Sequence, residues 1–285
     1  MRAVLQQYQI SPSRIYNTDE VGLLLSDMNL HFASTRENIQ GDLSNDHVTA
    51  LLTTCADGTP YPPYLLFPGT DTSVIPNIVQ ENKKLIWANF SEAGWMDETR
   101  FQVFILMFLQ ELKERSKQSD LLLPLSEFHL LLVDGHNSRL NSSTLFTCMM
   151  NCLIVFCGPS NLTQAWQAND AGVNKAFKDN MERAISHHVE AHQRFSSSDI
   201  VSFTLKAWSQ ENIVRSIRNS FRHVGIEPFD DSRMFTMIEQ EKPKEELLQS
   251  NLVLQTAVLM AKDHLDTLEN LTKEKRKRDE TESEK

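Results

Sequence analysis

The sequence predicts an α/β domain in which helices cover both faces of a mixed β-sheet. Its first part contains β-rich segments at 14–19, 47–55 and 64–67, and its middle contains two short, wholly apolar runs at 130–133 and 152–156. Runs that are apolar on both faces are typical of buried parallel strands. Three antiparallel strands followed by alternating helices and parallel strands predict the mixed sheet.

Turn signals and hydrophobic spacing predict the other elements. The sequence Ala56–Thr59 is a hairpin turn, and a short strand is expected at 85–87. From Asp97, large apolar residues recur at helix spacing, and Asp97 or Thr99 can cap this helix. Further helices are expected over 142–150, after Asp170 as far as about 189, over 200–209 and over 211–224, with a break at Ser196–Asp199.

We divide the chain into three parts. Residues 1–13 are interpreted as the remnant of a preceding helix or linker, 14–236 as the main domain, and 237–285 as a helical, charged C-terminal tail. Leucines recur through 244–271, which suits a docking helix or a short coiled coil that could form a homodimer. The basic cluster Lys273–Arg278 is typical of a nuclear localisation signal, and equally of a helix end whose charges match the dipole.

Composition excludes several classes of protein. The longest apolar runs are only strand-length, so no membrane span is expected, and Met1–Ile10 lacks the pattern of a signal peptide. The four cysteines are expected to be reduced thiols, because their spacing suits neither a disulfide framework nor a zinc site. The net charge of −10 argues against general nucleic-acid binding by the whole chain, although a local basic patch or a carboxylate site remains compatible with it.

Three aspartates stand in settings that suit a shared site. Asp134 directly follows the apolar run 130–133, and ligands of open α/β sheets collect at the carboxyl ends of strands. Asp19 lies on the first strand, and Asp170 lies in a polar loop just before a helix. One aspartate beside a strand is more often a turn or cap residue, but three in matching settings favour a common role.

Carboxylates of this kind can hold the metal ions of phosphodiester chemistry. Mg²⁺ and Mn²⁺ prefer carboxylate oxygens and retained waters over imidazole or thiolate, so a protein need supply only a few acids. Two such ions about 3.5–4 Å apart can activate an attacking water or hydroxyl and stabilise the leaving oxygen. A convergence of Asp19, Asp134 and Asp170 at one edge of the sheet would suit this chemistry.

Three ordered motifs between Ser11 and Arg183 resemble those of the pogo, Tigger and jerky-type DDE transposases, a mariner-related group. The first of the family's motifs has the usual form IYN-x-DE-x-G, the second LLLDGHxSH, and the third P-x-x-T followed by QPLDxGV. The segments that carry the resemblance are Ile15–Gly22, Leu131–Arg139, Pro159–Thr163 and Gln167–Val173, with Phe177–Lys178 matching the end of the third motif.

The resemblance implies an RNase H-like catalytic domain in which Asp19, Asp134 and Asp170 hold Mg²⁺, for which Mn²⁺ can substitute. In that mechanism water attacks a phosphodiester at a transposon end, and the freed 3′-hydroxyl then attacks target DNA. The chain departs from the motifs at Arg139, where the family usually has histidine, and at Ala168–Asn169, where it usually has Pro-Leu. A proline there would fix φ before the last helix.

The family reads DNA sequence through N-terminal helix-turn-helix domains, and this chain is expected to begin after them, so its DNA contacts should go to phosphates. Lys175, Lys178 and Arg183 are the candidates for these contacts. A second basic group, Arg215, Arg218 and Arg222, suits a solvated helix face at least as well.

The sequence leaves two functions open. The first is a nuclear, metal-dependent DNA endonuclease and strand transferase. The alternative is a domesticated, catalytically inactive nuclear DNA- or chromatin-binding protein that keeps the fold and dimerises through its C-terminal helix. The three aspartates favour the first function, and the acidic charge and Arg139 favour the second.

Overall fold

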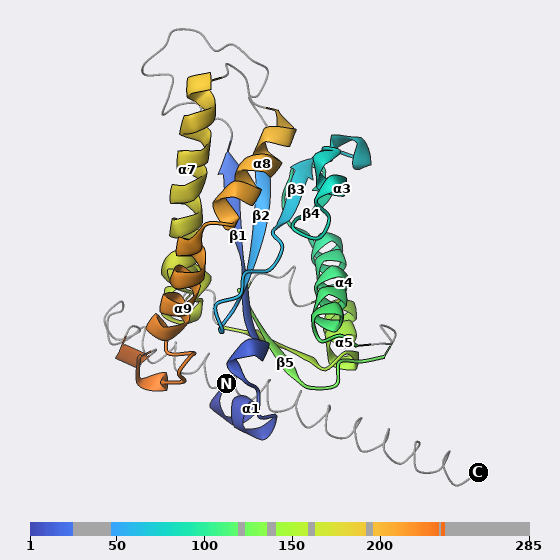
Figure 1. Ribbon diagram of the computed structural model, residues 1–285. Helices are drawn as coiled ribbons and strands as arrows, with labels where there is room; N and C mark the ends of the chain where they lie inside the picture. The colour runs from blue at the N-terminus through green and yellow to red at the C-terminus, as the bar shows by residue number, and fades with distance from the viewer. Residues whose placement is uncertain are drawn as a thin grey trace, which may run out of the picture.

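A six-stranded mixed sheet forms the centre of the computed structural model (Figure 1). The structure describes residues 1–24, 47–118, 123–135, 141–158, 163–191, 196–233 and 235–236. The strands are β1 (Ile15–Leu24), β2 (His47–Cys55), β3 (Tyr64–Pro68), β4 (Trp87–Ser91), β5 (His129–Val133) and β6 (Leu153–Cys157). The helices are α1 (Arg2–Gln7), α3 (Ile78–Glu81), α4 (Glu98–Arg115), α5 (Ser142–Met150), α6 (Thr163–Trp166), α7 (Asn174–Ala191), α8 (Ser197–Trp208) and α9 (Glu211–His223).

The strand order is β4-β3-β2-β1-β5-β6. Strands β1, β2 and β3 are antiparallel, and β5 and β6 continue the sheet parallel to β1. This confirms the predicted RNase H-like arrangement of three antiparallel strands followed by two parallel ones. A sixth strand, β4, adds to the far edge parallel to β3, and it begins two residues later than the strand expected at 85–87. The first strand also continues past Asp19 to Leu24.

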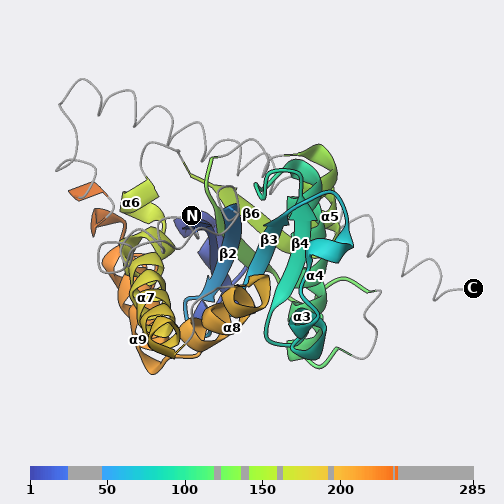
Figure 2. The same cartoon turned by 90° about the horizontal axis from the view of Figure 1, so that it is seen from above.

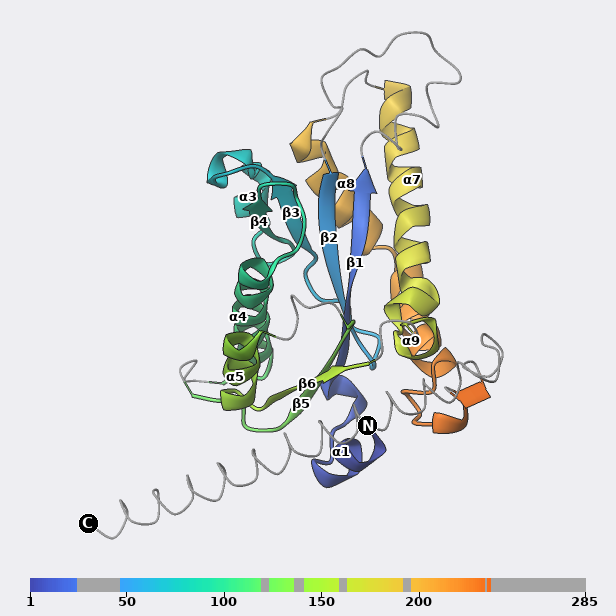
Figure 3. The ribbon, with the colours of Figure 1, turned by 180° about the vertical axis from the view of Figure 1, so that it is seen from behind.

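Two layers of helices enclose the sheet. Alternate residues of β1 point to opposite faces, so Ile15, Val21 and Leu23 lie in one buried cluster and Tyr16 lies in the other. Helices α7, α8 and α9 cover the first face, and α4 and α5 cover the second (Figure 1 and Figure 3). Seen from above, the strands run between these two layers (Figure 2). Odd-numbered residues of β1 therefore face α7, α8 and α9.

Side-chain caps fix where several helices begin. The Asp97 side chain accepts a hydrogen bond from the backbone N–H of Arg100 at 2.8 Å, which confirms the predicted cap of α4. The helix expected over 142–150 is confirmed at those bounds. Helix α8 begins at Ser197 rather than at residue 200, because Ser196 and Asp199 form a capping box at its start.

The N-terminal segment packs against the domain. Val4 and Ile10 are buried in the cluster beneath α7, α8 and α9, and the ring centroids of Tyr8 and Phe128 are 4.3 Å apart. Helix α1 lies beside the lower end of β1 (Figure 1). Residues 1–13 are thus in contact with the fold, whatever precedes them.

Three sequence predictions remain, and they concern the C-terminal tail, the cysteines and membrane-spanning helices. The predicted C-terminal helix and basic cluster, residues 237–285, lie outside the described residues. All four cysteines are free thiols, as expected. Among the residues whose positions the structure gives, no helix is both long and apolar enough to cross a membrane.

We expect the buried imidazole of His129 to make stability depend on pH. Burial, with a smaller effect from the positive charge of Arg14, lowers the pKa of His129 to about 4. A lowered folded-state pKa stabilises the protein above the unfolded value of 6.5, and this stability is lost as pH falls toward 4. Urea unfolding should therefore show that His129→Gln is less sensitive than the wild type to a change from pH 7 to pH 4.5, by about 2–3 kcal/mol. Equal losses in the two proteins would contradict this assignment.

Candidate active site

Two of the predicted aspartates follow the paired part of the neighbouring parallel strands β1 and β5. Asn17 of β1 is in register with Leu132 of β5, so Asp19 and Asp134 occupy equivalent positions two residues further along the chain. Asp134 directly follows the last residue of β5. Because side chains alternate along a strand, Asp19 shares the face of Asn17, and this is the face that α7 covers.

The third aspartate, Asp170, is connected to Asp19 through the side chain of Asn174. Asp170 lies in the π-helical turn Asn169–Val173, which leads directly into α7. Asn174, the first residue of α7, donates from Nδ2 to Asp19 Oδ2 at 2.6 Å and to Asp170 Oδ1 at 3.2 Å. One amide nitrogen therefore joins two carboxylates that are far apart in the sequence.

The electrostatics of Asp19 reflect this convergence. Burial raises the pKa of Asp19 well above the usual range of an aspartate, and the negative charge of Asp170 and a hydrogen bond with its carboxyl group raise it further. The hydrogen bond from Asn174 opposes this rise in pKa, and the charge of Asp134 adds a smaller increase. Asp170 and Asp134 are thus both close enough to Asp19 to raise the pKa of its carboxyl group.

A buried glutamine links Asp134 to Asp170. With the amide nitrogen of Gln167 turned toward Asp170, it donates to Asp170 Oδ2 at 3.1 Å, and the amide oxygen accepts from the backbone N–H of Asp134 at 3.1 Å. Gln167 has no exposed surface, whereas Asp170 is exposed, so the amide connects the interior to a carboxylate at the surface. It ties the end of β5 to the turn that carries Asp170.

A second buried network docks this turn onto the sheet. The backbone N–H of Asn169 donates to Asn17 Oδ1 at 2.8 Å, and the Asn17 amide donates to the carbonyl of Leu132 at 3.2 Å. Asn169 Oδ1 accepts from the Thr54 hydroxyl at 2.6 Å, and Asn169 Nδ2 donates to the carbonyl of Leu52 at 2.9 Å. Asn17 and Asn169 thereby connect β1, β2 and β5 directly to the residue before Asp170.

This network gives a physical account of one departure from the family motif. Ala168 has φ −61° without a proline, so the backbone adopts the angle that the ring would have imposed. Asn169 takes the place of the usual leucine and is wholly buried with its polar atoms bonded. The other departure, Arg139, lies outside the described residues.

The oxygen atoms of Asp19, Asp170 and Asn174 suit a hard divalent cation, although they do not form a complete set of ligands. Within the described part of the chain, no three Asp, Glu, His or Cys side chains are grouped closely enough to hold a metal ion. Asp19 and Asp170 nevertheless meet at one amide, and Asn174 Oδ1 is buried without a hydrogen-bond partner. Oxygen ligands from carboxylates and amides are those that Mg²⁺ and Mn²⁺ prefer. The residues present therefore fit such an ion at the Asp19–Asp170 pair.

The predicted DNA-contacting residues differ in their surroundings. Lys178 is exposed one turn after Asn174, so it lies on the helix face that continues from the acidic site. Lys175 is exposed and forms an ion pair with Asp179 at 3.5 Å, and Arg183 lies further along the exposed side of α7. In the second basic group, Arg218 donates to the carbonyl of Asp57 at 3.0 Å, which gives it a structural role.

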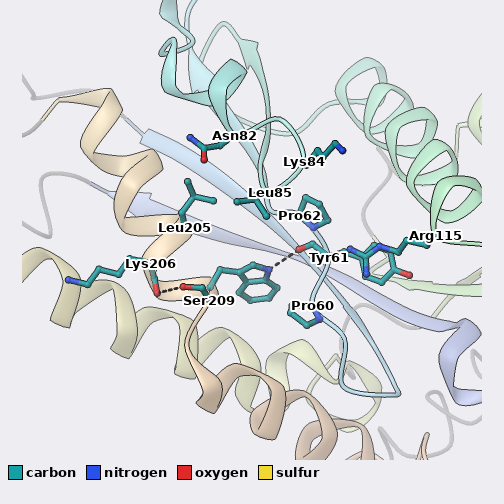
Figure 4. A pocket seen from close by; sticks show the side chains of 11 residues that line it. Pro60, Tyr61, Pro62, Asn82, Lys84, Leu85, Arg115, Leu205, Lys206 and Ser209 are labelled. Atoms are coloured by element: carbon teal, nitrogen blue, oxygen red, sulfur yellow. Dashed lines mark hydrogen bonds between the residues drawn. The ribbon is translucent and has the colours of Figure 1, made fainter.

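A separate cavity of about 470 Å³ lies among α8, the segment before β3 and the segment before β4 (Figure 4). Trp208 forms part of its wall and donates from its indole nitrogen to the carbonyl of Tyr61 at 2.8 Å. Its charged lining residues are Lys84, Arg115 and Lys206, without a carboxylate among the residues that line it. The cavity shares no residue with the acidic site and is therefore not part of the candidate metal site.

Four further residues belong to the site without being predicted from the sequence: Asn17, Gln167, Asn169 and Asn174. Asn17 and Gln167 stand inside the quoted motifs, within three residues of a predicted aspartate. Asn174 follows Asp170 by four residues, which is the helical spacing for a shared face. The sequence signal for these polar residues is therefore their spacing from the aspartates. Spacing alone does not show which polar side chains point into the site.

Solved structures similar to this chain come from the Mos1 transposase. A Mos1 pre-cleavage transpososome has a TM-score of 0.47 and 12% identity, covering 84% of this chain and 59% of that one. The Mos1 mariner paired-end complex with Mn has a TM-score of 0.46 and 13% identity, covering 83% and 60%. The Mos1 catalytic domain with raltegravir and Mg has a TM-score of 0.43 and 14% identity, covering 80% and 90%. The chain thus spans about three fifths of the Mos1 polypeptide in the first two complexes.

Sequence comparison supplies the family. No curated protein matches the chain. The family profile described as DDE superfamily endonuclease matches residues 45–224, which is more than half of the 285 residues. The matched range contains Asp134 and Asp170 and begins after Asp19. The chain therefore belongs to the DDE superfamily endonucleases.

Proposed function

We propose that this chain is a transposase-derived DNA endonuclease of the pogo, Tigger and jerky type, with Asp19, Asp134 and Asp170 as its metal ligands. The observation that carries this proposal is the bridge from Asn174 to Asp19 and Asp170, at 2.6 and 3.2 Å. It joins an acid on β1 to an acid before α7, and the register of β1 and β5, which pairs Asn17 with Leu132, supports Asp134 as the third acid. Family membership supports DNA as the substrate.

Each residue of the site has a distinct part in this function. Mg²⁺ or Mn²⁺, when bound, would polarise the phosphodiester and lower the pKa of an attacking water. Asp19 and Asp170 would hold the ion, with Asp134 as a further carboxylate. Gln167 orients Asp170 relative to the end of β5, and Asn17 and Asn169 hold the turn against the sheet. The positions of the acids are thus fixed by buried hydrogen bonds before DNA arrives.

The test is nicking of supercoiled plasmid by the purified chain with Mg²⁺ or Mn²⁺. We expect metal-dependent nicking by the wild type and a loss of at least about 100-fold in Asp134→Asn, because even groups behind the metal ligands contribute 10–100-fold. Glu92→Gln, an exposed acid in the turn after β4, is the matched control and should nick normally. Nicking that persists in Asp134→Asn would contradict the assignment of this acid.

The inactive DNA- or chromatin-binding protein is the alternative outcome of that test. It is favoured by the lack of a closed three-carboxylate cluster in the described residues. It predicts no nicking by the wild type and no stabilisation by Mn²⁺, since a ligand that binds only the folded state must raise its stability. Binding to DNA would then persist without metal.

We further propose that Lys175, Lys178 and Arg183 contact DNA phosphates. Lys178 is the strongest of these, because it continues the helix face of Asn174. In a titration of DNA binding against salt, Lys178→Ala should weaken binding for all sequences alike and reduce the slope of log K against log salt by about 1. Lys206→Ala, an exposed lysine on α8, is the control and should leave the slope unchanged. A similar effect of both variants would show that net charge, and not position, is responsible.

The assignments beyond the site are proposals from the sequence alone. We propose residues 14–236 as the catalytic domain, 237–285 as a separate charged tail, and the helix predicted over 244–271 as a means of homodimerisation. Nuclear localisation through Lys273–Arg278 suits a protein that acts on DNA.

A further inference from the structure

The amide of Asn174 lies where two carboxylates meet, and only half of it is hydrogen-bonded. Its nitrogen donates to Asp19 at 2.6 Å and to Asp170 at 3.2 Å. Its oxygen, Oδ1, is buried and has no hydrogen-bond partner. A buried acceptor without a partner costs about 1–3 kcal/mol, and most such groups in proteins are satisfied. The two carboxylates thus set the present orientation of the amide and leave its oxygen without a hydrogen bond.

Rotation about the Cβ–Cγ bond exchanges the oxygen and the nitrogen of an asparagine amide. In the metal-free protein this rotation is unfavourable for Asn174, because it would turn an oxygen toward the two carboxylates. A cation between the carboxylates reverses the preference, since it repels an N–H group and attracts an amide oxygen. The rotated oxygen would lose no hydrogen bond, because Oδ1 has none at present. Nδ2 would give up its two hydrogen bonds to the carboxylates, and the attraction between these carboxylates and the cation would replace them.

We propose that Asn174 is a ligand of the metal site that the proposed function places at Asp19 and Asp170. Without metal the amide bridges the two acids as a donor. With a divalent cation bound, the amide rotates and Oδ1 becomes a neutral oxygen ligand. Asn174 thereby serves both states of the site, and this inference rests on the proposed metal-dependent function.

The dimensions of the bridge suit this role. Neighbouring ligands in an octahedral Mg²⁺ site are roughly 3 Å apart, given metal–oxygen distances of about 2.1 Å. The terminal amide atom of Asn174 already lies 2.6 Å from Asp19 Oδ2 and 3.2 Å from Asp170 Oδ1. Exchange of nitrogen for oxygen therefore places a third oxygen at ligand spacing from two carboxylate oxygens with little movement of the backbone.

The test measures Mn²⁺ affinity by electron paramagnetic resonance of the free ion, alongside the melting temperature in EDTA. Asn174→Leu keeps the branch at Cγ and removes both polar atoms, although leucine is larger, and we expect it to weaken Mn²⁺ binding about 10- to 100-fold. Asn174→Asp supplies an oxygen ligand, so it should bind Mn²⁺ at least as tightly as the wild type while melting at a lower temperature in EDTA. Asn219→Leu makes the same change at an exposed position of α9 and should leave Mn²⁺ affinity unchanged.

The outcomes separate this inference from the proposed function. If the wild type and Asn174→Leu bind Mn²⁺ equally well, while Asn174→Leu melts at a lower temperature in EDTA, Asn174 is only a bridge in the metal-free protein and the inference is wrong. If the wild type binds no Mn²⁺, the proposed metal site and the inference fail together. Should Asn174→Leu not fold, weaker Mn²⁺ binding by Asn174→Asp than by the wild type would equally overturn it.

Discussion

Replacement of Asp170 by asparagine should make the metal-free protein more stable and remove its response to metal. Asp170 is the nearby charge with the largest effect on the pKa of Asp19, so its loss relieves repulsion between two carboxylates at one amide. We expect the melting temperature in EDTA to rise by about 2–4 °C, the shift that roughly 1 kcal/mol produces in a domain of this size. The same variant should lose Mn²⁺-induced stabilisation and at least about 100-fold in plasmid nicking.

Asp179→Asn is the matched control for this prediction. Asp179 lies on the same helix and pairs with Lys175 at the surface, so its replacement should change neither the melting temperature by more than about 1 °C nor the effect of Mn²⁺. Opposite effects on stability and metal response are characteristic of a site in which carboxylates are crowded in order to bind a cation. A fall in the melting temperature of metal-free Asp170→Asn would contradict the repulsion that the pKa of Asp19 indicates.

Replacement of Asn169 by leucine should destabilise the protein more than any surface change considered above. Asn169 is fully buried, and its loss leaves the Thr54 hydroxyl and the Leu52 carbonyl without the partners at 2.6 and 2.9 Å. At about 1–3 kcal/mol for each buried group left unsatisfied, we expect a loss of roughly 2–5 kcal/mol in the free energy of unfolding, measured with urea. Metal binding should weaken in parallel, because Asp170 is the next residue.

A double-mutant cycle with Thr54→Val distinguishes a lost hydrogen bond from a packing defect. If the hydroxyl of Thr54 and the amide of Asn169 act as a pair, Asn169→Leu should cost less in the Thr54→Val background, by about 0.5–3 kcal/mol. Additive losses would mean that leucine destabilises the turn through its shape alone. In that case the buried network would not be what positions Asp170.

Local sequence patterns predicted much of this fold because those patterns follow directly from burial. All five residues of β5, which contains the apolar run 130–133, are buried, and the large apolar residues of α4 face one core at helix spacing. Asp134 could be located from sequence because it directly follows such a run. The register between β1 and β5 could not, since it depends on pairing across more than one hundred residues.

Other parts of the site depend on contacts between residues far apart in the sequence, and such contacts leave no periodic pattern in it. The π-helical turn before α7 is held by Asn169 bonding to β1 and β2, and neither partner is near it in sequence. Edge strand β4 is short and only partly buried, so its start was misplaced by two residues. Asn174 resembles any polar residue at a helix start until the two carboxylates beside it are known.

The most direct test of the account is a crystal structure of the chain grown with Mn²⁺, with anomalous diffraction data collected at the manganese edge. We expect an anomalous peak in contact with carboxylate oxygens of both Asp19 and Asp170, on the side of Asp134. The amide oxygen of Asn174 should be turned toward this peak. Well-diffracting crystals without a peak between Asp19 and Asp170, or with peaks only elsewhere, would contradict the claim that these acids form one metal site.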